Sequence, residues 1–222
     1  MAQLVWDADG TRFFEMGTDR GVLYKKTEDG TYGDGVAWNG LTAVTESPSG
    51  AEKSDFWADN MKYASMLSAE DFSATIEAYT YPDEFAECNG EKSIANGVNA
   101  GQQARTGFGF SYRTKIGSDA NSEAGYKLHL VYGCLASPSE KAYATVNDSP
   151  EAATMSWEVT TTPVSSTHLT KPTATLTFNS LECDDTKLAA LEAILYGTSG
   201  EPGTMPRLPL VDEIVTLMST GA

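Results

Sequence analysis

The amino-acid sequence predicts a mainly β fold with two packed antiparallel sheets, as in a β-sandwich or half-barrel, one flanking α-helix, and extended N- and C-terminal arms. Apolar and polar residues alternate with period two in five separate segments. One buried and one polar face per strand is typical of antiparallel sheets. We expect a single domain over residues 1–222, because the length suffices for one core and no linker interrupts the chain.

The five alternating segments are the expected strands, and they span 72–78, 108–113, 126–132, 155–161 and 173–178. In the third segment Leu128 and Leu130 fall on one face, whereas His129 falls on the other. A further strand is expected over 36–46. Gly40 interrupts it, which indicates a bulge or a close backbone approach.

One flanking helix is predicted over 184–196. Asp184 or Asp185 is suited to cap its first amides, and Gly197 is suited to end it. Its apolar residues recur at helical spacing: Leu188, Leu191 and Leu195. A second, short helix is expected at 82–88, because Pro82 is acceptable in a first turn.

Three segments look built for contact with other molecules: the N-terminal arm 1–20, a long loop 47–69 and the C-terminal arm 198–222. A loop of this length inside a compact domain is usually functional or disordered. We expect the loop to be poorly ordered in a free monomer and to become ordered on assembly. The assembly residues predicted in it are Phe56, Trp57, Asp59, Asn60, Met61 and Tyr63.

The C-terminal arm is expected to be extended, because Pro206 and Pro209 exclude it from a central strand. We therefore expect residues 205–222 to matter more for assembly than for folding. Exposed-looking aromatic residues allow two interpretations, a sugar-binding platform or a protein interface, and their spread along arms and a loop favours the interface. These residues are Trp6, Trp38, Trp57 and Tyr63.

The composition is strongly acidic, with 31 acidic and 15 basic residues and a formal charge of −16. This balance argues against a protein that grips nucleic acid, because phosphate binding needs clustered Lys and Arg. It fits either simple solubility or a surface past which a polyanion slides. Three scattered cysteines, Cys88, Cys134 and Cys183, are expected to be reduced packing thiols. The first residues show no signal-peptide pattern, and no apolar run is long enough to span a membrane.

No segment carries a catalytic pattern. His129 and His168 lack partners at metal-ligand spacing, and the adjacent carboxylates at the two expected helix starts are explained by capping. We therefore predict that the protein is not an enzyme and has no catalytic, cofactor-binding or metal-binding residues.

Several stretches resemble the major tail (tail tube) proteins of long-tailed, non-contractile bacteriophages, and together they cover most of the chain from Val36 to Met218. They are VAWNGLTAVTESPSGAE, ADNMKYASMLSAEDFSATIEAYTYPDEFAEC, RTGFGFSYRTKIGSD, YKLHLVYGCLASPSEKAYATVNDSPEAATMSWEVTTTPV and LPLVDEIVTLM.

The resemblance implies two orthogonal β-sheets and hexameric rings that stack into a hollow tube. DNA would pass through the tube without specific binding. The two arms and the loop 47–69 would join stacked rings, and the other partners would be tail terminator, tape-measure and distal tail proteins. The protein would reside in the host cytoplasm before assembly and in the virion tail afterwards, with no membrane partner.

Three acidic residues, Glu46, Glu77 and Glu158, lie on or beside polar faces of expected strands. They are candidates to line the lumen, where negative charge would repel DNA phosphates. The alternative is that they face outer solvent or a neighbouring subunit. For the whole protein, a carbohydrate- or surface-binding β-sandwich module remains the alternative function.

Overall fold

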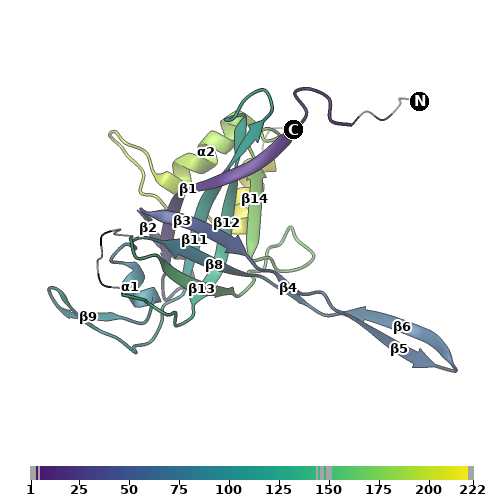
Figure 1. Ribbon diagram of the computed structural model, residues 1–222, viewed down its shortest axis with the longest axis horizontal. Helices are drawn as coiled ribbons and strands as arrows, with labels where there is room; N and C mark the ends of the chain where they lie inside the picture. Colours follow the sequence, from purple (N-terminus) through teal and green to yellow (C-terminus); the bar gives the residue numbers. More distant parts are fainter. Residues whose placement is uncertain (1–3, 5, 144, 146–147, 149–151, 220–222) are drawn as a thin grey trace.

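The computed structural model describes residues 4, 6–143, 145, 148 and 152–219. The fold is mainly β, as predicted (Figure 1). The strands of the main sheet are β1 Phe13–Lys26, β2 Tyr32–Ala37, β3 Leu41–Glu46, β8 Ser73–Ala78, β11 Phe108–Ser118, β12 Gly125–Ala136, β13 Met155–Thr161 and β14 Thr175–Asn179. The remaining elements are β4 Ser49–Gly50, β5 Lys53–Ala58, β6 Met61–Leu67, β7 Glu70–Asp71, β9 Lys92–Ala95, β10 Val98–Ala100, α1 Phe85–Cys88, α2 Asp185–Tyr196 and α3 Val211–Ser219.

The two expected layers are parts of one antiparallel sheet with the order β2-β1-β11-β12-β13-β8-β3. The long strand β12 belongs to both layers, because residues 127–131 pair with β14 whereas residues 134–136 pair with β13. Gly133 marks the change of partner with a φ of 61°. A Cβ at this position would lie 2.2 Å from the carbonyl oxygen of Thr162. Only glycine therefore fits where the sheet turns from one layer into the other.

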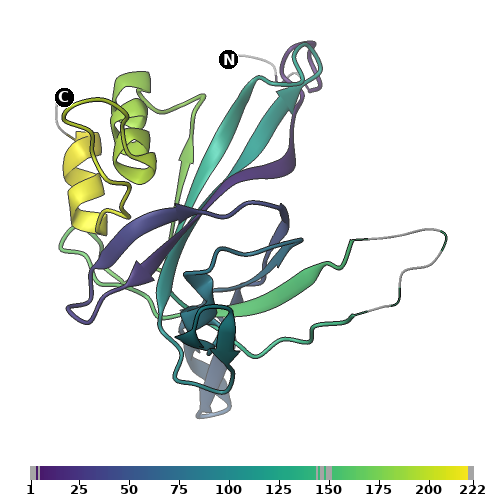
Figure 2. The same cartoon turned by 90° about the vertical axis from the view of Figure 1, so that its left-hand side faces the viewer.

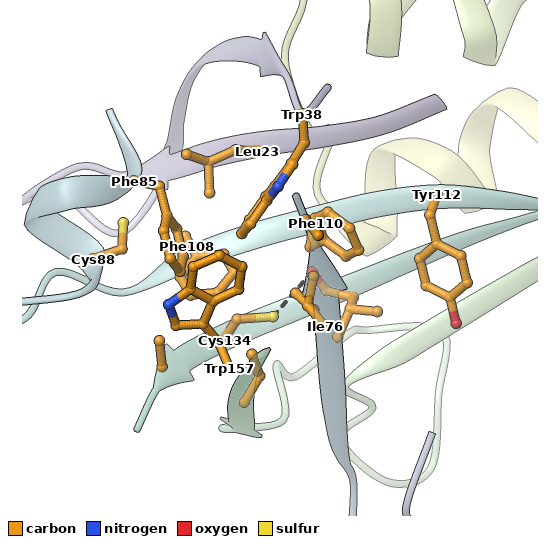
Figure 3. Close-up of a cluster of buried hydrophobic side chains, with 14 residues drawn as sticks. Leu23, Trp38, Ile76, Phe85, Cys88, Phe108, Phe110, Tyr112, Cys134 and Trp157 are labelled. Atoms are coloured by element: carbon orange, nitrogen blue, oxygen red, sulfur yellow. Dashed lines mark hydrogen bonds between the residues drawn. The ribbon is translucent and has the colours of Figure 1, made fainter. Parts of the chain in front are cut away.

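The first hydrophobic core lies between these two layers (Figure 3). Trp157 from β13 and Phe108 from β11 are both fully buried. Phe85 from α1 lies between them, with its ring centroid 5.3 Å from that of Trp157 and 5.6 Å from that of Phe108. Trp38 completes the group and is only 3% exposed. Its placement corrects the expectation that Trp38 is an exposed aromatic.

A second core lies between residues of β1, β2 and β12 and the helices α2 and α3 (Figure 2). The α2 helix matches the prediction closely. The Asp184 side chain accepts hydrogen bonds from the amides of Thr186 and Lys187, and Gly197 ends the helix with a φ of 74°. The side chains that α2 buries are the three predicted leucines, Leu188, Leu191 and Leu195.

The C-terminal arm differs from its prediction, since residues 211–219 form the helix α3 instead of an extended piece. Asp212 and Glu213 occupy its first turn, where carboxylates complement the helix dipole. Val211 and Ile214 are both 2% exposed and belong to the second core. Pro206 and Pro209 do not exclude a helix here, because both precede α3 and neither interrupts it.

The ends of two other predicted segments also shift. The expected strand 36–46 is split, because β2 ends at Ala37 and β3 begins at Leu41. Gly40 lies in the turn between them with a φ of 75°, and its carbonyl accepts a hydrogen bond from the amide of Tyr79. The predicted N-terminal arm 1–20 is shorter than expected, because β1 already begins at Phe13.

Candidate assembly surface

The segment 47–69, predicted as a loop, is a β-hairpin that projects far from the body of the molecule (Figure 1). Strands β5 and β6 pair antiparallel and are joined by Asp59 and Asn60. These two residues have φ values of 50° and 62°. Positive φ at both central residues is typical of the type I′ turn that suits a two-residue hairpin loop. The structure therefore gives this segment a regular form, a hairpin in place of an irregular loop. Its expected poor order in a free monomer stays a prediction.

The sequence does contain a signal for this hairpin, namely the pair Asp59-Asn60 between two runs of strand-forming residues. The apolar content of the segment obscures it, because the apolar residues do not alternate strictly. A register shift between Phe56 and Trp57 explains the broken alternation. Asp59 and Asn60, predicted as assembly residues, thus hold the tip of the hairpin.

The two faces of the hairpin differ in chemistry. Opposite residues of a strand pair share a face, and so do residues two apart in one strand. One face is therefore apolar, and we call it the apolar hairpin face. Its members are Ser54, Phe56, Ala58, Met61, Ala64 and Met66.

The opposite hairpin face is held together by charge. The Asp55 carboxylate lies 2.6 Å from the Lys62 ammonium and 3.7 Å from that of Lys53. Ser65 donates a hydrogen bond to the same carboxylate. These interactions lower the pKa of Asp55, with Lys62 as the main cause. Trp57 belongs to this face by its pairing with Lys62, whereas Tyr63 lies at the register shift.

Every residue of β5 and β6 is exposed. Among the predicted assembly residues the exposed fraction is 49% for Phe56, 62% for Met61, 69% for Trp57 and 76% for Tyr63. A two-stranded hairpin is marginally stable in water by itself. An exposed apolar face on such an element indicates a surface that another molecule covers.

A second exposed apolar region lies where the N-terminal segment joins β1. Leu4 and Trp6 are 72% and 75% exposed. Phe13, Phe14 and the nearby Leu181 are also exposed. A groove of about 470 Å³ lies beside Phe13, Phe14 and Leu181. Its other lining residues are Glu15, Ile116, Lys127, Asn179 and Glu182.

The C-terminal arm has an exposed part, residues 198–205, and a part that packs on the body of the molecule. Its irregular part follows the outer edge of β2. There the Gly35 amide donates a hydrogen bond to the carbonyl of Pro206, and the backbones of Asp34 and Arg207 form an isolated antiparallel β-bridge. It thereby covers an edge that would otherwise be open to strand pairing. Met205 is 66% exposed, but Leu208 is only 3% exposed. The second half of the predicted C-terminal contact segment thus packs within the chain, whereas the first half is exposed.

The three candidate lumen acids divide between two faces of one layer. Glu77 lies opposite Ser156 in the pairing of β8 with β13, and Glu158 lies opposite Thr75. Both acids are therefore on the face that points away from the first core. Glu46 lies opposite Ala74, on the inner face with Val44 and Ile76. The structure thus separates Glu46 from the other two candidates.

The outward face of β3, β8 and β13 has a simple composition. In the register of these strands it contains no lysine or arginine among its described residues. Its members are Ala43, Thr45, Ser73, Thr75, Glu77, Ser156, Glu158 and Thr160. The helices α2 and α3 cover the other layer, on the far side of the molecule (Figure 2).

The two histidines have different surroundings. His129 is half-buried and stacks on Tyr112, with ring centroids 4.6 Å apart, and its Nε2 lies 3.0 Å from Thr114 Oγ1. The amide of His168 donates to Ser166 in an exposed loop. Within the described ranges, no three His, Cys, Asp or Glu side chains cluster in a way that would hold a metal ion. The helices of the described part of the chain are all too short or too polar to cross a membrane.

The buried cysteines belong to the first core. Burial raises the pKa of Cys88 to about 12 and raises the pKa of Cys134 as well. Both thiols therefore stay protonated at neutral pH.

Comparison with protein-family models gives no match for this chain, and no curated protein matches it either.

Proposed function

We propose that this chain is the structural subunit of a phage-type tail tube, which assembles into stacked hexameric rings around a conduit for DNA. The observation that carries the proposal is the projecting β5–β6 hairpin with its exposed apolar face. The sequence resemblance to tail tube proteins supports the same conclusion and is the source of the hexameric number.

The form of the hairpin favours open-ended assembly. It extends from one edge of the body, so it can reach a surface on another copy that lies far from that copy's own hairpin (Figure 1). Contacts between unlike surfaces are heterologous, and they generate rings or filaments instead of closed dimers. The charge of the hairpin is compatible with such a contact. The charges of its two lysines and two aspartates cancel within residues 53–67, although the whole chain has a formal net charge of −16.

The outward face of β3, β8 and β13 is our candidate for the wall of the conduit. Small hydroxyl side chains and two acids, Glu77 and Glu158, give it no strong attraction for phosphate. Repeated around rings, these carboxylates would repel the DNA backbone over about 8 Å at physiological salt. Glu46 is withdrawn from this candidate set, because its side chain is on the inner face.

The remaining partners follow from the same proposal. A tube needs molecules that end it and set its length, which are the tail terminator, tape-measure and distal tail proteins. The subunit would be made in the host cytoplasm and would function in the virion tail.

Electron microscopy of the purified protein tests the proposal directly. We expect rings or hollow tubes whose number rises with protein concentration. The matched control is a variant with Phe56→Ser and Met66→Ser, which removes the apolar hairpin face and should remain monomeric. Monomers of the native chain that bind polysaccharide would refute the proposal and favour a carbohydrate-binding module, with Trp57 and Tyr63 as its exposed platform.

A further inference from the structure

The β5–β6 hairpin is anchored to the body at both of its legs. On the outgoing leg, the Tyr112 hydroxyl donates a hydrogen bond of 2.5 Å to Glu46, the last residue of β3. On the returning leg, the Thr161 hydroxyl donates to the carbonyl of Phe72 at 2.7 Å. Between the legs, Ser73 donates from its side chain to the carbonyl of Ser47.

Glu46 lies at the margin of the first core. The strand register puts it on the inner face of its layer, but its side chain is 44% exposed, so burial does not explain its contacts. Its Oε1 accepts the hydrogen bond from Tyr112 on β11 and lies 3.6 Å from Nδ1 of His129 on β12. The carboxylate thus makes polar contacts with two strands of the other layer. Such contacts fix a direction, because a hydrogen bond weakens steeply when its angle changes.

The partner of Glu46 is itself held firmly. Tyr112 is 2% exposed, and its ring stacks between Phe110 and His129 at centroid distances of 5.6 and 4.6 Å. Burial, with the Glu46 carboxylate as a further cause, raises the pKa of Tyr112, so the phenol keeps its proton and donates. Burial lowers the pKa of His129, so the imidazole is neutral at pH 7 and does not compete as a cation.

We propose that Glu46 is a positioning residue, whose hydrogen bond to Tyr112 sets the direction in which the β5–β6 hairpin leaves the body. The contact joins the end of β3 to β11 in the other layer, at the point where the chain leaves β3 and passes through β4 to β5. A hairpin held in its binding orientation loses less conformational freedom on association. The inference rests on the proposed function only in assuming that the hairpin then binds a second copy.

Spin-label distance measurements on the monomer test the positioning role. One label is attached at Ala58→Cys at the hairpin end and one at Ala189→Cys on the exposed side of α2, in a Cys183→Ser background. The two remaining cysteines are buried and do not react. We expect Glu46→Ala and Tyr112→Phe each to shift or broaden the distance distribution.

Two controls separate the hydrogen bond from charge and from general loss of stability. Glu46→Gln keeps an oxygen acceptor for Tyr112 and should retain the native distribution. Glu77→Ala removes an acid from the outward face of the same layer and should have no effect. An unchanged distribution in the Glu46→Ala variant, with a folded body by circular dichroism, would overturn the inference.

Assembly provides a separate readout. We expect Glu46→Ala and Tyr112→Phe each to raise the protein concentration needed for assembly by roughly tenfold, since one charged hydrogen bond is lost. The double variant should add little to either single one, because both remove the same contact. If the hairpin shifts in Glu46→Ala and assembly is unaffected, the positioning role stands and the proposed function of the hairpin fails.

Discussion

The β5–β6 hairpin and the C-terminal segment 208–219 are both apolar, and the sequence predicts both as contact segments, yet their environments are opposite. Phe56 and Tyr63 in the hairpin are 49% and 76% exposed, whereas Leu208 and Ile214 are 3% and 2% exposed. The difference is whether the chain itself supplies a surface to cover the apolar groups. The outer face of β1, β2 and β12, together with α2, does so for the C-terminal segment. No comparable face lies against the hairpin strands, all of whose residues are exposed.

The largest effect should come from removing the C-terminal segment. Deletion of residues 208–222 removes three buried side chains, each of which contributes about 1.5–3 kcal/mol. This sum is comparable with the whole stability of a typical domain, so we expect the truncated chain to unfold. Ile214→Ala alone should cost about 2–5 kcal/mol. Urea denaturation measures both, and the exposed Met205→Ala is the control. If the truncated chain forms stable folded monomers, this segment is not needed for folding, and its predicted role as a contact arm is favoured instead.

The next effect concerns the hairpin and should appear in assembly instead of stability. Phe56→Ala with Met66→Ala removes the centre of the apolar hairpin face, and we expect at least about a tenfold higher concentration for assembly. The free energy of unfolding should change by less than about 0.5 kcal/mol, because both residues are exposed. Sedimentation and urea denaturation measure the two quantities.

The pair Trp57→Ala and Tyr63→Ala sharpens this comparison. Trp57 lies on the hairpin face that carries Asp55 and Lys62, and Tyr63 lies at the register shift. The same loss of assembly from this pair would show that both faces of the hairpin are covered. If the Trp57→Ala and Tyr63→Ala variant forms normal tubes while the Phe56→Ala and Met66→Ala variant stays monomeric, the contact is made by the apolar hairpin face alone.

A smaller effect is expected at the candidate conduit wall. Glu77→Lys and Glu158→Lys would each place one cation per subunit on a face without lysine or arginine. Tubes should still form, but they should retain DNA more strongly at low salt and lose this difference at high salt. Fluorescent DNA binding to assembled tubes measures this, with Glu201→Lys on the exposed C-terminal segment as the control. Equal DNA retention by all three variants would argue against this face as the wall.

The smallest effect is a pH dependence of the free energy of unfolding, and we expect it to come from His129 in the body of the molecule and not from the hairpin. Burial holds the pKa of His129 below its usual 6.5, with Tyr112 stacked on it and Glu46, Glu15 and Lys127 nearby. The unfolded chain therefore binds a proton first as pH falls through about 6.5, and stability declines from there down to the folded pKa. His129→Gln should reduce this decline in urea denaturation between pH 7.5 and 5.5. An identical decline in that variant would assign it to other groups.

The sequence by itself determined the fold class and much of the local structure. Alternation with period two depends only on neighbouring residues, and it located β8, β11, β12, β13 and β14. The helix α2 was equally local, because Asp184, three spaced leucines and Gly197 specify its start, its buried face and its end.

Tertiary structure alone decided which apolar and acidic residues are exposed. Trp38 and Trp57 look alike in the sequence, but only Trp38 meets a second layer of sheet. Glu46 and Glu77 both lie on strands of one layer, and the register of β3 against β8 puts them on opposite faces. A side chain's face depends on this pairing, which a shift of one residue would reverse. Exposure depends on which distant segment packs against it, and this information is not local to any part of the sequence.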